Sequence, residues 1–149
     1  MAIFKLPKDF KKTTTKKVVK RPVDEEQEAK DDLARLFSNM ACGDVQDLKN
    51  ILIDARTLYE PRKTTKIRSI LPVLVRLKNQ ATLFGYPLVS DVVSHLEKIV
   101  QKSTSFPEQK FTVMYNDVLL LQEILWKKIK GDGGERGRKI LNRLTRIPK

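Results

Sequence analysis

The sequence predicts an all-α protein: an up-and-down bundle of four main helices, with extra helical segments at its ends and a disordered basic tail at the N-terminus. Apolar residues recur at steps of three and four along most of the chain, no segment alternates as a strand would, and the predicted connections are short. Of the 149 residues, 40% are apolar and 32% are charged, which is the usual balance for one domain with a core of its own.

Positive charge is concentrated at the two ends of the chain. Residues 1–22 hold eight Lys or Arg against one acid, and residues 127–149 hold nine against two, so each end carries +7 while the middle carries −2. Residues 1–22 are expected to be flexible, because this polar, self-repelling segment cannot bury enough apolar surface to offset its ordering. Such ends are either simply solvated or suited to an anionic partner, such as nucleic acid, acidic lipid or an acidic protein face.

The first two predicted helices span about residues 23–41 and 44–59. Acidic residues follow Asp24 in the first turn, where they complement the helix dipole. Gly43 is expected to end the first helix, and Asp44 to begin the second. The first helix presents one apolar stripe at helical spacing, made of Ala29, Leu33, Leu36, Phe37 and Met40.

The next two predicted helices span about residues 64–84 and 87–102, joined at a Gly-Pro corner. Pro72 lies inside the first of them, so we expect a kink there or a late start of the main helix. Gly85 fits the position just after a helix end.

A fifth helix is predicted over about residues 107–129, and its wide apolar surface indicates a central position with Tyr115 and Trp126 in the core. Gly131, Asp132, Gly133 and Gly134 then indicate a flexible hinge, followed by a basic helix over about residues 135–147. The predicted organisation is therefore a tail (1–22), a helical bundle (23–130), and a hinge with a basic C-terminal helix (131–149).

The residue types give little sign of catalysis. Cys42 and His95 are the chain's single cysteine and single histidine, so an internal disulfide is excluded and a Cys/His zinc site is implausible. Asp31 and Asp32 are adjacent and therefore do not share a helix face. No apolar run approaches the length of a membrane span, and we expect a cytoplasmic protein that has no catalytic residue, metal or cofactor.

The segment from Leu77 to Leu88 and the helix that follows resemble the helical hairpin of histidine phosphotransfer (HPt) domains. That family's pattern is H-x-L-K-G-S/A-x-x-x-x-G before a returning helix. Leu77 and Lys78 match the Leu-Lys pair, Ala81 is a small residue one position after the S/A of the pattern, and Gly85 matches the closing glycine. The resemblance covers roughly residues 30–129.

Two departures from the pattern bear on function, because Val75 stands at the histidine position and Asn79 at the following glycine. Valine has no nucleophilic atom to accept phosphate. The resemblance therefore implies a binding module that docks a response-regulator receiver domain or a histidine kinase without phosphotransfer. The residues expected to contact that partner are Arg68, Val75, Arg76, Lys78, Asn79 and Gln80.

Two alternatives remain open at this point. The C-terminal basic residues could bind phosphates of nucleic acid without reading its sequence, and they are Arg136, Arg138, Lys139, Arg143 and Arg146. His95 has Lys98 three residues later and could accept a phosphoryl group, although its place near an apolar stripe favours a structural histidine.

Overall fold

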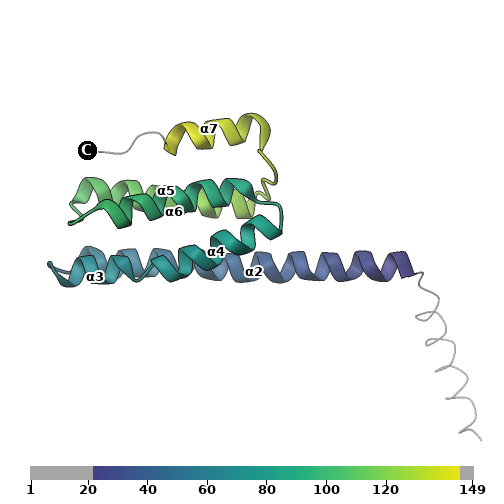
Figure 1. The fold of residues 1–149 in the computed structure, drawn as a ribbon, viewed down its shortest axis with the longest axis horizontal. Coiled ribbons are helices and arrows are strands. Elements are labelled where there is room, and N and C mark those ends of the chain that lie inside the picture. The colour runs from purple at the N-terminus through teal and green to yellow at the C-terminus, as the bar shows by residue number, and fades with distance from the viewer. Residues whose placement is uncertain (1–21, 145–149) are drawn as a thin grey trace, which may run out of the picture. The chain divides into compact units, whose positions relative to one another are not determined.

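The computed structural model describes residues 22–144, and this part of the chain is all-helical, as the sequence predicts (Figure 1). The predicted tail, apart from Pro22, and the last five residues lie outside the described residues, and so does Arg146. The helices are α2 (Pro22–Arg56), α3 (Arg62–Arg68), α4 (Leu71–Leu83), α5 (Pro87–Lys102), α6 (Glu108–Trp126) and α7 (Gly134–Leu144).

The chain divides into two compact units, residues 1–36 and 37–149, which differ from the predicted limits at residues 22 and 130. The described part of the first unit, residues 22–36, is a helical segment with exposed apolar side chains. Leu33 and Leu36, expected on a buried stripe, are 53% and 55% exposed. Of the predicted stripe only Phe37 is buried, because periodicity shows which residues share a helix face and not whether another segment covers that face.

The predicted break at Gly43 is wrong, because α2 runs without interruption from Pro22 to Arg56. A glycine weakens a helix by only about 1 kcal/mol. Here the apolar residues continue across it, since Ala41, Val45 and Leu48 are all buried on one side of α2. Asp44 does not cap a new helix; its carboxylate instead binds Arg76 of α4.

The predicted kink near Pro72 is confirmed. The helix expected over 64–84 is divided into α3 and α4, and the division falls at Ser69 and Ile70, just before the proline. Pro72 occupies the first turn of α4, where its missing N–H costs no hydrogen bond. The helix predicted over 87–102 coincides with α5, and α6 is a few residues shorter than predicted. The last three residues predicted for the C-terminal helix, 145–147, lie outside the described residues.

Within residues 37–144, α4, α5 and α6 follow one another in alternating directions, and one apolar core joins them to α2, α3 and α7 (Figure 1). The core excludes Trp126, which was expected inside but is 69% exposed. The largest of its fully buried side chains include Leu48, Leu52, Ile67, Leu74, Leu77, Leu96, Phe106, Met114, Leu121 and Ile124. No described helix has the length and apolar character that crossing a bilayer requires.

The glycine-rich segment before α7 is packed against the body. Gly131 N–H donates to the carbonyl of Gly85, in the α4–α5 corner, at 3.0 Å. Gly85 has φ +83°, and Tyr86 N–H reaches back to the Ala81 carbonyl at 2.9 Å, which together form a Schellman helix end. Gly137 lies so close to the Asp132 carbonyl that a Cβ there would be 1.7 Å from its oxygen. The segment is therefore a tight corner that fixes the start of α7.

Two glycine substitutions test the tight corner before α7 and the continuity of α2. They should change the free energy of unfolding in opposite directions. Gly137→Ala should destabilise the fold by about 1–3 kcal/mol, because its methyl group meets backbone that has to shift. Gly43→Ala should stabilise it by about 0.5–1 kcal/mol, because a Cβ at Gly43 meets nothing within 4 Å and the position is helical. Urea denaturation measures both. A destabilising Gly43→Ala would contradict the continuous α2.

Candidate functional site

The exposed side of α4 carries a narrow ridge, which we call the α4 ridge and define as Pro72, Val75, Asn79 and Leu83. These residues follow one another at helical spacing, on the side turned away from the buried Leu74, Leu77 and Ala81. Val75 is 48% exposed and Leu83 is 82% exposed. The residue at the histidine position of the HPt pattern therefore lies on the surface, near the middle of a helix.

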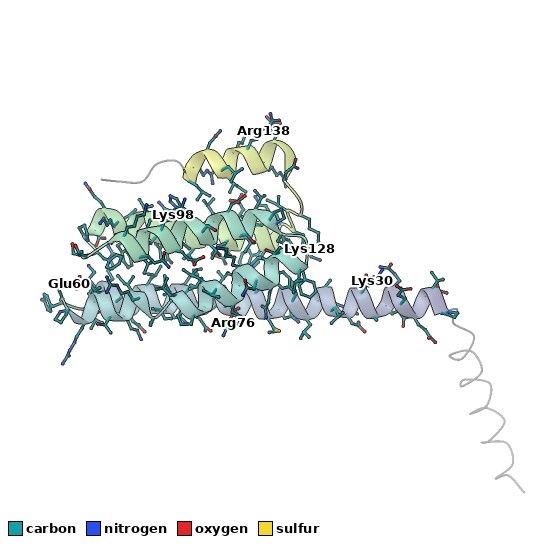
Figure 2. The ribbon with its side chains drawn as sticks, viewed as in Figure 1. Lys30, Glu60, Arg76, Lys98, Lys128 and Arg138 are labelled. Atoms are coloured by element: carbon teal, nitrogen blue, oxygen red, sulfur yellow. The ribbon has the colours of Figure 1, made fainter. Side chains whose placement is uncertain are left out.

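Arg76 borders the α4 ridge on the side of α2 (Figure 2). Its guanidinium donates to both carboxylate oxygens of Asp44, at 2.6 and 3.3 Å. The side chain of Asp44 is only 9% exposed, whereas that of Arg76 is 49% exposed. Hydrogen bonding to Asp44 and its charge raise the pKa of Arg76 above its ordinary value. Arg76 is thus held in one orientation with part of its surface open.

Lys78 borders the α4 ridge on the side of α5. Its ammonium lies 3.4 Å from a carboxylate oxygen of Glu97, and 41% of the Lys78 side chain is exposed. One turn further, the hydroxyl groups of Thr82 and Ser90 lie 3.1 Å apart, which adds a second polar link between α4 and α5. Lys78, which matches the Lys of the HPt pattern, and Glu97 of the returning helix α5 are therefore partners.

The other two predicted contact residues lie less centrally. Arg68 belongs to α3 and donates to the carbonyl of Ser103, after α5, at 3.2 Å. Gln80 is half-buried, and its side-chain oxygen is buried without a hydrogen-bond partner. Val75, Arg76, Lys78 and Asn79 thus form one surface, while Arg68 lies on the preceding helix and Gln80 is only partly accessible.

The surface of α3 and α4 has one sign of charge. Between Glu60 and Asp91 the sequence contains no acidic residue. It contains six basic ones over the same stretch, namely Arg62, Lys63, Lys66, Arg68, Arg76 and Lys78. Even with Arg76 and Lys78 each paired to one carboxylate, this side of the molecule favours an acidic partner.

His95 is buried, and its side chain is only 9% exposed. Its Nδ1 lies 2.5 Å from a carboxylate oxygen of Asp117 in α6, and its Nε2 is buried with no hydrogen-bond partner among residues 22–144. Burial raises the pKa of Asp117 to about 6, although the hydrogen bond to His95 and its charge act in the opposite direction. Neither ring nitrogen is open to an incoming aspartyl phosphate, so this geometry argues against His95 as a phosphoacceptor.

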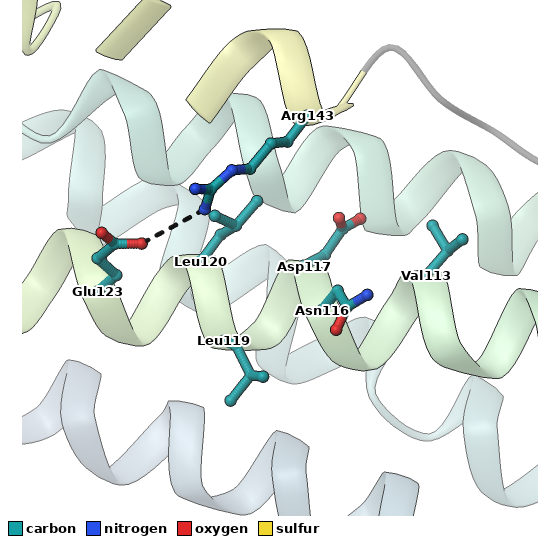
Figure 3. Close-up of a pocket in the computed structure, with 7 residues that line it drawn as sticks. All are labelled: Val113, Asn116, Asp117, Leu119, Leu120, Glu123 and Arg143. Carbon is teal, nitrogen blue, oxygen red and sulfur yellow. Dashed lines mark ion pairs between the residues drawn. The ribbon is translucent and has the colours of Figure 1, made fainter. Parts of the chain in front are cut away.

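The basic residues of α7 fall into two groups. Arg136, Arg138 and Lys139 are exposed, and Figure 2 shows Arg138 on the outer side of the helix. Arg143 instead turns to Glu123 of α6 at 3.8 Å. Figure 3 shows this pair across a cavity of about 490 Å³ between α6 and α7. The residues that line this cavity are Val113, Asn116, Asp117, Leu119, Leu120, Glu123 and Arg143.

The sequence reading missed the acidic partners of these sites. The sequence predicts that Asp44 begins a helix, and its local pattern does not single out Asp117, although an acid followed by Val118 and three leucines inside a strongly apolar helix is a signal of a buried partner. No cluster of three or more metal-binding side chains occurs among residues 22–144.

Comparison with protein-family models found no match to the chain. Comparison with curated proteins found none, and no solved structure matches it. The resemblance to HPt domains therefore depends on the residues of the α4–α5 hairpin themselves.

The buried carboxyl of Asp117 should make the stability of the fold depend on pH. Its folded pKa of about 6 lies above the ordinary 3.8, so its stabilising contribution is complete below pH 3.8 and is lost as pH rises through about 6. Asp117→Asn cannot ionise, and its stability should fall less than that of the wild type as pH rises over this range. Urea denaturation across the pH series measures the difference. Parallel curves for the two proteins would contradict a raised pKa.

Proposed function

We propose that this chain is a non-catalytic docking module, an HPt-like four-helix bundle made of α4, α5, α6 and residues 37–56 of α2. In this proposal it binds a receiver domain through the α4 ridge and accepts no phosphate. The observation that carries the proposal is the exposure of Val75, in the middle of α4, at the position where the resembled family has its histidine.

The residues around Val75 support the binding of a protein partner better than they support phosphoryl transfer. An apolar side chain that is half exposed gains free energy when a partner covers it, by roughly 25 cal/mol for each Å² removed from water. Val75 offers no nucleophile, and the neighbouring Asn79 fills the space that the family leaves to a glycine. Val75 therefore gives the surface an apolar centre, and Asn79 places a polar amide beside it.

The charges beside the ridge support a receiver domain as the partner. The active site of a receiver domain is acidic, as the family resemblance implies, and the surface of α3 and α4 is basic. Because Arg76 and Lys78 are already held by Asp44 and Glu97, less side-chain entropy is lost when a partner covers them. A histidine kinase remains the second possible protein partner.

Calorimetry with a panel of purified receiver domains tests the proposal. We expect binding by at least one, and equal binding when the phosphorylatable aspartate of that receiver is replaced by alanine, because no phosphoryl transfer is involved. Val75→Glu should weaken binding by about tenfold or more, or about 1.4 kcal/mol, because it places a carboxylate against an acidic surface.

A control is Arg138→Glu, which lowers the charge by two units, against one unit for Val75→Glu, on the exposed side of α7 and away from the ridge. It should leave receiver binding unchanged. If no receiver binds, or if both variants weaken binding equally, docking through α4 is wrong.

A second candidate function is favoured by α7, where Arg136, Arg138 and Lys139 are exposed and belong to no ion pair within residues 22–144. Cations of this kind bind the phosphates of nucleic acid without reading its sequence.

If α7 has this role, replacing these three residues by glutamate should abolish binding to duplex DNA and flatten the dependence of its affinity on salt, as measured by fluorescence anisotropy. Val75→Glu serves as the control and should bind DNA as the wild type does. Wild-type binding that does not change with salt would contradict contacts to phosphate.

A further inference from the structure

A second exposed surface lies where α2 and α6 run side by side, and it shares no residue with the α4 ridge. The ammonium of Lys49 donates to the side-chain oxygen of Gln122 at 3.0 Å, and Arg56 bonds Glu108 at 2.7 Å. Residue numbers rise along α2 as they fall along α6 in these pairs, so the two helices are antiparallel neighbours over this stretch.

We define the α2–α6 face by its outward side chains from both helices. From α2 it has residues that follow one another at helical spacing, Cys42, Gln46, Lys49 and Ile53. From α6 it has Leu119, Gln122 and Trp126, again at helical spacing.

Three apolar side chains of this face are open to solvent. Ile53 is 51% exposed, Leu119 is 39% exposed and Trp126 is 69% exposed. Leu119 is among the residues that line the cavity between α6 and α7, but Figure 3 shows its side chain pointing away from α7 and from Arg143. A single exposed apolar residue is ordinary, but a Trp with two aliphatic neighbours along one helix pair is typical of a protein contact.

The face also has little charge. Lys49 is its one ionisable cation, half-buried and bound to the neutral Gln122, while the chain as a whole carries +12. Most of that positive charge lies at the two ends of the chain, and the middle carries −2. A nearly neutral face adds little repulsion between two copies, and depletion of charged residues is typical of the centre of protein interfaces.

The shape of the face points to its occupant. A hollow of about 150 Å³ lies beside Trp126, lined by Cys42, Val45, Gln46, Gln122, Leu125 and Trp126 itself. This is below the roughly 300–1,000 Å³ of small-molecule sites, so it suits one side chain rather than a ligand. A large apolar side chain next to a hollow of that kind is self-complementary across a two-fold axis, because each copy can place its Trp126 in the hollow of the other.

We propose that the α2–α6 face is the contact of a symmetric homodimer, in which Trp126 of each chain enters the hollow beside Cys42 of its partner. The area offered by two short helix segments is small, so the dimer is weak and its population depends on protein concentration.

Sedimentation velocity on the full chain across the micromolar range tests the proposal. The wild type should shift from monomer to dimer as concentration rises, and Trp126→Ala should stay monomeric over the same range. Trp126 is the chain's single tryptophan, so its fluorescence reports the contact directly, and its emission should shift to shorter wavelength as the dimer forms.

Two further variants distinguish the loss of dimer formation from a defect in the folding of the monomer. Ile53→Lys changes an exposed residue and introduces a charge on the face, so it should also prevent dimer formation while leaving the circular dichroism of the monomer unchanged. Tyr59→Ala removes an aromatic side chain that is 89% exposed outside the face, and its dimer should form as in the wild type.

A maleimide reagent gives an independent measurement, because Cys42 is the single cysteine and lines the hollow that the partner's Trp126 fills. At concentrations that favour the dimer, the thiol of Cys42 should react at least several-fold more slowly in the wild type than in Trp126→Ala. A wild type that stays monomeric throughout, or a dimer that survives in both face variants, overturns the proposal. None of these measurements involves a receiver domain. If the dimer is not found, the proposal that the α4 ridge binds a receiver domain still stands, and if no receiver domain binds, the dimer proposal still stands.

Discussion

One backbone hydrogen bond joins the two turns that precede α5 and α7. The N–H of Gly131 reaches the carbonyl of Gly85, and Lys130 lies over the ring of Tyr86 with its ammonium 5.7 Å from the ring centre. Phe37 of α2 stacks on Phe84 at 4.7 Å between ring centres, beside the same corner. Three helices and the start of a fourth therefore meet where α4 ends, and this junction fixes how α4 presents its outer side.

The two cations that border the α4 ridge are held in place by acidic residues of the neighbouring helices, and not by residues of the ridge itself. A carboxylate on α2 holds Arg76 and a carboxylate on α5 holds Lys78, so each neighbouring helix contributes one anchor. Both carboxylates are largely buried and both cations are partly exposed, so these are not ordinary surface ion pairs. They fix the orientation of Arg76 and Lys78, which keeps two long side chains from covering the exposed Val75.

The polar pair in the interior has a different role. His95 and Asp117 face each other between α5 and α6, away from solvent, and their burial costs free energy that a pair of apolar residues would not incur. The pair gives the α5–α6 contact a defined register, which a wholly apolar seam would specify less well. The chain thus keeps its one imidazole as a structural group in the core, and leaves a valine on the surface where the resembled family has its reactive histidine.

The sequence alone determined the helical class, the break before Pro72, the limits of α5 and the unreactive residue at position 75, because these depend on local periodicity, proline geometry and residue identity. Tertiary structure decided what local rules cannot. Gly43 remains helical because buried neighbours on both sides of it outweigh its weak propensity, and Trp126 lies outside because the core is filled without it. The partners of Arg76, Lys78 and His95 lie 19 or more positions away in the chain, so only packing brings them together.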